Sequence, residues 1–238
     1  MKKINRYSIW IFGFVPMFLL ATAISCSQFF STSLAPWAAR DPASLIPPVT
    51  TGNVNELIEM AENDPDMSLE VLKRIKDAAQ NADSDKAGDL QAAALKAAAN
   101  ASGIGSALLQ QAGNISELMD NADNAIDLIV DVLNSMNNLN AAGDNLVEIL
   151  PTPGTSEFDA FVAKSSADDL AIAAAVLLAA EAKSVSDSKD YLDSFDGSGT
   201  GPQVELAIAL AKAADTKGME LSSSLKDILG GLNLVDYS

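Results

Sequence analysis

Three groups of oxygen-bearing side chains have a spacing that could bind a cation. Asp64, Asp66 and Ser68 take the first, third and fifth places of a calcium loop. The sixth place is Leu69 rather than glycine and the twelfth is Ile75 rather than glutamate, so the turn and the bidentate ligand are missing. Capping of a helix by Asp64 is the simpler interpretation of the same residues.

The second group is the acidic segment before a GSGTG loop. A cation could be held there by carboxylates and loop carbonyls, but no glutamate follows Asp196 at the twelfth position. The glycines lack the Lys-Ser/Thr of a phosphate-binding loop. A solvated acidic loop is therefore favoured over a metal site; the segment's aspartates are Asp187, Asp190, Asp193 and Asp196.

A third acidic group has helical spacing. Steps of 3, 4 and 4 residues place its members on one side of a helix. Such a stripe could bind a basic partner or a metal, and the alternative is a solvated face. Its members are Asp120, Asp123, Asp127 and Asp131.

Residues for catalysis are scarce. Histidine is absent, which removes the commonest general base and the commonest metal ligand. Lys183 and Ser184 are adjacent in sequence and would not face each other on a helix. No nucleophile has a recognisable base or oxyanion arrangement. The sequence predicts neither an enzyme nor a cofactor or metal site.

The first 25 residues have the organisation of a secretory signal. Lys2, Lys3 and Arg6 are followed by an apolar run from Ile9 to Ile24. The charged end stays on the cytoplasmic side while the apolar run enters the translocation machinery. A membrane-spanning helix needs about 20 apolar residues, and Pro16 would disturb one. A cleaved signal is favoured over a permanent span.

The signal ends in Ala23, Ile24, Ser25 and Cys26. This ending resembles the lipobox of bacterial lipoproteins, in which small or aliphatic residues precede the cysteine that is lipidated and becomes the mature N-terminus. Leucine is usual in that family where Ala23 stands here. The resemblance covers residues 1–26 and implies a lipid anchor in the cell envelope. Serine rather than aspartate after Cys26 favours the outer membrane or periplasmic side.

Cys26 is also the only cysteine in the chain of 238 residues. A lone thiol in an exported protein has no disulfide partner and would otherwise be a reactive liability. Lipidation of Cys26 is therefore favoured over ordinary cleavage with an incidental cysteine.

Charge restricts the partners of the mature chain. Without residues 1–25 it has 12 basic and 32 acidic residues, a formal charge of −20. Such a surface repels phosphate backbones and anionic headgroups. The sequence therefore excludes nucleic acid as a partner, and contact with the membrane is expected through the lipid anchor alone.

Domain organisation follows from composition and helix signals. Residues 1–25 form the signal peptide, residues 26–50 a tether rich in Pro and Ser, and residues 51–238 a helical domain. Asn53 with Glu56 predicts a capping box, and Ser166 with Asp169, and Pro202 after the GSGTG loop, predict later helix starts. No stretch shows sustained strand-like alternation, so the predicted fold class is all-α.

Five windows of the domain repeat the same organisation. Each holds two helical runs around a polar or glycine-containing break, and the starts are 35, 35, 45 and 36 residues apart. A period near 35 is typical of stacked antiparallel helical hairpins. It is similar in length to tetratricopeptide-type solenoids, although their landmark residues do not match. We expect about five helix-turn-helix units with a break at 151–157, and a helical bundle is the alternative. The windows start at Val54, Asp89, Asn124, Asp169 and Glu205.

One segment, Leu170 to Ala180, is apolar on every face. Its 11 residues are too few to span a bilayer, so we expect a helix that other helices cover on all sides.

Taken together, these features predict a lipid-anchored envelope protein that acts by binding. The first hypothesis is an interaction module or scaffold for another envelope protein, such as a component of a transport or assembly system. The second is a carrier that holds a hydrophobic small molecule between its helices. A surface-exposed structural lipoprotein is the third.

Overall fold

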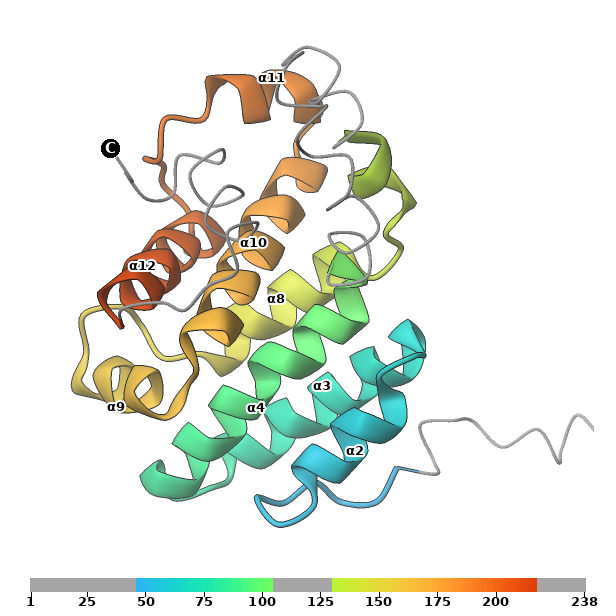
Figure 1. Ribbon diagram of the computed structural model, residues 1–238, viewed down its shortest axis with the longest axis vertical. Helices are drawn as coiled ribbons and strands as arrows, with labels where there is room; N and C mark the ends of the chain where they lie inside the picture. Colours follow the sequence, from blue (N-terminus) through green and yellow to red (C-terminus); the bar gives the residue numbers. More distant parts are fainter. Residues whose placement is uncertain (1–45, 105–129, 218–238) are drawn as a thin grey trace, which may run out of the picture. The chain divides into compact units, whose positions relative to one another are not determined.

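The computed structural model describes residues 46–104 and 130–217 (Figure 1). The chain divides into two units, residues 1–45 and residues 46–238, and the described helices all belong to the second. These residues form helices and loops with no strand among them, which confirms the predicted all-α class. The helices are α2 (Val54–Ala61), α3 (Pro65–Gln80), α4 (Ser84–Ser102), α8 (Leu139–Ile149), α9 (Ser156–Lys164), α10 (Ala167–Ser184), α11 (Ser188–Ser194) and α12 (Pro202–Thr216), and residues 130–135 are also helical.

Helices α3 and α4 form an antiparallel hairpin. Asp64 caps the start of α3 by accepting from the backbone N–H groups of Asp66 and Met67, with Pro65 in the first turn. Asp83 caps α4 by accepting from Lys86 N at 3.1 Å. Only residues 81–83 connect the two helices, so they must run antiparallel, and they make the most extensive contact of any helix pair described.

Helix α10 is the centre of the apolar core. Every residue from Ala173 to Ala180 is buried, and Val176 and Leu177 are completely inaccessible to solvent. The predicted apolar segment is thus a covered helix, longer than expected at both ends. Contacts with α4, α8, α11 and α12 cover it. None of the helices in the described ranges is long and apolar enough to cross a bilayer.

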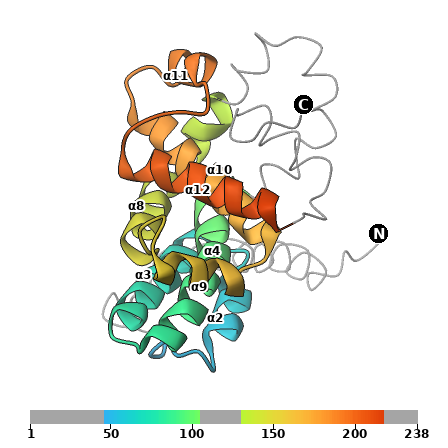
Figure 2. The ribbon, with the colours of Figure 1, turned by 90° about the vertical axis from the view of Figure 1, so that its left-hand side faces the viewer.

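Helix α8 contacts α3 and α4 and also α10 and α12. Polar contacts link it to two of these helices: Lys76 of α3 binds Glu148 at 2.9 Å, and Gln203 of α12 donates to Asp144 at 2.9 Å. Figure 2 shows the same helices turned by 90°.

A glycine brings α8 close to α10. A Cβ on Gly143 would lie 2.6 Å from the Cβ of Ala180, closer than real Cβ atoms approach one another. The two backbones can therefore pack at this distance only while residue 143 has no side chain.

The contacts between distant helices match a bundle, one of the two predicted arrangements. In a solenoid each repeat contacts only its neighbours. Here α3 reaches α8, and α4 reaches both α9 and α10. The most extensive pairs are α3 with α4 and α10 with α12. Residues 105–129 lie outside the described residues, so the number of helix-turn-helix units stays a prediction.

The predicted helix starts have mixed outcomes. Ser166 caps α10, accepting from Asp169 N at 3.0 Å and donating to the Asp169 carboxylate at 2.6 Å, and Pro202 opens α12. The capping box at α2 is wrong. Asn53 makes no cap bond to α2, because its side chain accepts from Thr50 and donates to Pro48 O.

Those bonds to Thr50 and Pro48 hold the entry strap of the domain, residues 46–53. Ile46 and Val49 are buried in the core, each less than a tenth exposed. The packed domain therefore begins about five residues before the position that composition alone suggests.

The close approach of α8 and α10 can be tested by substitution. We expect Gly143→Ala to destabilise the fold by about 1–3 kcal/mol, because the new methyl group overpacks a tight contact. Adding Ala180→Gly removes the clash and should recover part of that loss, less about 1 kcal/mol of helix propensity. Denaturant unfolding of the two single variants and the double variant measures the coupling. Strictly additive effects would contradict the contact.

Burial of α10 gives a second prediction. Val176→Asp places a carboxylate where no partner exists among the described residues, and we expect it to abolish folding or cost at least about 4 kcal/mol. Val176→Ala should cost about 2 kcal/mol and stay folded. Circular dichroism with urea titration distinguishes the two, and a stable Val176→Asp variant would refute the covered position.

Candidate functional site

Most of the predicted acidic stripe falls outside the described residues. Asp120, Asp123 and Asp127 lie outside the described residues, and so does Cys26. Asp131 lies on the helical segment 130–135 and is exposed. The stripe and the lipidation site therefore stay predictions.

The calcium-like spacing at the start of α3 serves the fold. Asp64 is the cap of the helix, and Asp66 accepts from Asn138 Nδ2 at 2.8 Å. Ser68 is buried and donates to Ala61 O at 2.7 Å, which ties α3 to the end of α2. Helix capping by Asp64 is confirmed, and all three side chains have partners inside the chain.

The acidic segment after α10 also forms local structure. Asp187 caps α11 by accepting from Asp190 N at 3.0 Å. Asp196 accepts from both the backbone N–H and the hydroxyl of Ser198, and these hydrogen bonds lower the pKa of Asp196. Across the described residues, no group of three or more acidic, cysteine or histidine side chains could hold a metal ion.

Lys183 and Ser184 bind different carbonyl groups rather than each other. The Lys183 ammonium donates to the carbonyl of Met136, and the Ser184 hydroxyl donates to Glu181 O at 2.7 Å. Each is engaged with a different carbonyl, as expected for neighbours on a helix end.

Basic side chains in the described ranges mostly bind this chain's own oxygens. Lys183 and Lys217 donate to backbone carbonyls, the latter at the end of α9. Ion pairs engage most of the others: Lys73 and Arg74 with Glu70, Lys76 with Glu148, Lys86 with Asp83, Lys96 with Asp169, and Lys164 with Asp85 and Asp89. Few cations are left to neutralise the remaining surface carboxylates.

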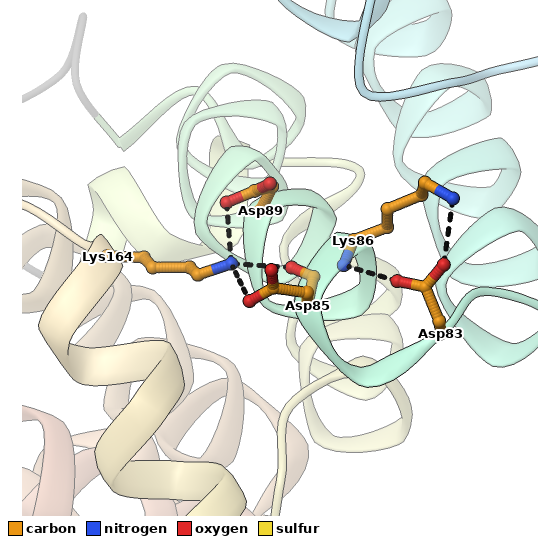
Figure 3. A network of polar contacts seen from close by, with 5 residues as sticks. All are labelled: Asp83, Asp85, Lys86, Asp89 and Lys164. Carbon is orange, nitrogen blue, oxygen red and sulfur yellow. Dashed lines mark hydrogen bonds and ion pairs between the residues drawn. The ribbon is translucent and has the colours of Figure 1, made fainter.

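The densest of these contacts joins α9 to the first turns of α4 (Figure 3). Lys164 Nζ lies 2.9 Å from Asp89 Oδ1, 3.2 Å from Asp85 Oδ1 and 2.5 Å from the Asp85 carbonyl. Beside it, Lys86 binds Asp83 at 2.8 Å. We call the contact of Lys164 with Asp85 and Asp89 the α9 clasp.

The neighbouring oxygens raise the pKa of both lysines, Lys164 and Lys86. The hydrogen bond to Asp89, aided by Asp85, raises the pKa of Lys164, and the hydrogen bond to Asp83 raises that of Lys86. The same bond from Lys86 lowers the pKa of Asp83. Figure 3 shows no unengaged cation in this group.

Gly88 lets the side chain of Lys164 lie along α4. A Cβ on Gly88 would lie 3.1 Å from Lys164 Cδ, which is tight, so the bare backbone leaves room for the lysine stem. Phe158 and Phe161 anchor the same helix in the core, with ring centroids 5.8 Å apart in an edge-to-face arrangement. The clasp is therefore a structural contact, and its two carboxylates, Asp85 and Asp89, are paired with Lys164.

The outward side of α2 differs from the α9 clasp, because its carboxylates have no ion-pair partner among the described residues. Val54, Leu57, Ile58 and Ala61 face the core, which leaves the other side of the helix exposed. Glu56 and Glu59 on this side, and Glu62 directly after the helix, are exposed and make no ion pair with any described residue. We call them, together with Met60, the α2 face.

Met60 makes this face unusual. Its side chain is 62% exposed, and it is the only large hydrophobic residue of the described ranges that is exposed. A flexible thioether beside unneutralised carboxylates can contact an apolar group while the carboxylates attract a cation.

Sequence reasoning missed the α2 face, although a signal was present. Core positions at 54, 57, 58 and 61 predict that residues 56, 59 and 60 point outward. The clasp left no such signal, because Lys164 is 75 residues or more from its partners in sequence.

The comparisons with known proteins add no assignment. No family model, curated protein or solved structure matches this chain.

The clasp predicts a specific pH dependence of stability. Because the Lys164 pKa is raised in the folded chain, its contribution is fully present at neutral pH and is lost as the pH rises through that raised value, above the ordinary 10.5. Lys164→Met keeps an apolar stem over Gly88 and removes the charge. Wild type should unfold at a higher urea concentration than Lys164→Met at pH 7, and the difference should shrink near pH 11.5. A difference that stays constant from pH 7 to pH 11.5 would show that the ammonium is not responsible.

Proposed function

We propose that this protein is a lipid-anchored component of the bacterial cell envelope whose helical domain binds a basic, amphipathic segment of another envelope protein. The α2 face is the proposed contact surface. The observation that carries the proposal is the exposure of Met60 beside Glu56, Glu59 and Glu62, carboxylates without an ion pair to any described residue.

Charge complementarity favours this class of partner. Basic side chains of the described residues are largely engaged internally, so a cation brought by a partner meets little competition from them at the α2 face. Exposed carboxylates attract a positively charged protein over a Debye length, about 8 Å at physiological salt. Met60 then supplies an apolar contact that salt does not screen.

The proposed anchor fits the start of the packed domain. Ile46 is the first described residue and is buried, and it stands 20 positions after Cys26 in the chain. A chain of that length reaches at most about 70 Å when fully extended. Acyl chains on Cys26 would hold the domain within this distance of the membrane surface, while its negative charge keeps it off anionic headgroups.

Lipidation is tested by mass and by substitution. Membrane-extracted protein should begin at residue 26 and carry acyl chains, because the lipobox-like ending directs modification of Cys26. Cys26→Ala should retain the signal or release the protein from the membrane fraction. A wild-type product cleaved elsewhere and free of lipid would end the anchoring proposal and leave the binding proposal standing.

The α2 face is tested by neutralising its carboxylates. Glu56→Gln, Glu59→Gln and Glu62→Gln together should slow association with the partner by on the order of tenfold at low salt and flatten its salt dependence. Met60→Gln should instead raise the dissociation rate with the salt dependence unchanged. The partner is first recovered from solubilised envelope with wild-type protein, and association is then measured by surface-binding kinetics from 50 to 500 mM NaCl.

A matched control separates local from overall charge. Asp77→Asn on α3 and Glu205→Gln and Asp215→Asn on α12 change the net charge equally at exposed positions outside α2. The proposal predicts little effect from this control. Equal slowing by both triple variants would mean that only net charge matters, and stoichiometric recovery of a hydrophobic small molecule without a protein would favour a carrier instead.

A further inference from the structure

We draw no further inference here: the strongest candidate, the pair of buried side-chain amide oxygens of Asn140 and Asn145 on α8, carries no proposal because nothing in the described part of the structure shows what donor would occupy either position.

Discussion

The burial of α10 is the constraint on which the rest of the described structure depends. A helix with apolar residues on every side is destabilised wherever water reaches it, by roughly 25 cal/mol for each Å² of exposed apolar surface. Helices must therefore approach it from several directions, and α4, α8 and α12 do so. Alanine makes these approaches close, and where α8 passes Ala180 even a methyl group is excluded at Gly143.

Close packing of this kind places the charged residues at the edges of the helices. Lysines there reach across to another helix and bind carbonyls or carboxylates, as Lys164 does from the end of α9 to α4 and Lys217 does from the end of α12 to the end of α9. Exposed ion pairs stabilise a fold only modestly, and Asp85, 95% exposed, is such a partner. Their larger consequence is for the surface. Because most cations of the described residues are engaged within the chain, Glu56, Glu59 and Glu62 have no ion-pair partner among those residues.

Local signals explain how much of this fold could be predicted from sequence. The all-α class, the covered helix at 170–180 and the cap by Ser166 follow from residue types within a few positions of each other. Asn53 shows the limit of such signals, since its side chain could cap α2 or bind the preceding strap and the buried Ile46 and Val49 favour the strap. Contacts between distant residues, such as Lys164 with Asp89, depend on how the helices pack and have no local signature. The α2 face was accessible to a helical-wheel argument, but its lack of ion pairs could be seen only once the partners of the lysines were known.

The central claim is that a basic partner contacts the α2 face in the intact envelope. The most direct measurement places a photo-crosslinking amino acid at Met60 in the full-length protein, with the exposed Ala160 of α9 as the matched control position. Irradiation of intact cells should join residue 60, and not residue 160, to one envelope protein through a segment rich in Lys or Arg. That product should disappear when Glu56, Glu59 and Glu62 are changed to glutamine. Equal crosslinking at both positions, or a product that persists in the glutamine variant, would contradict the account.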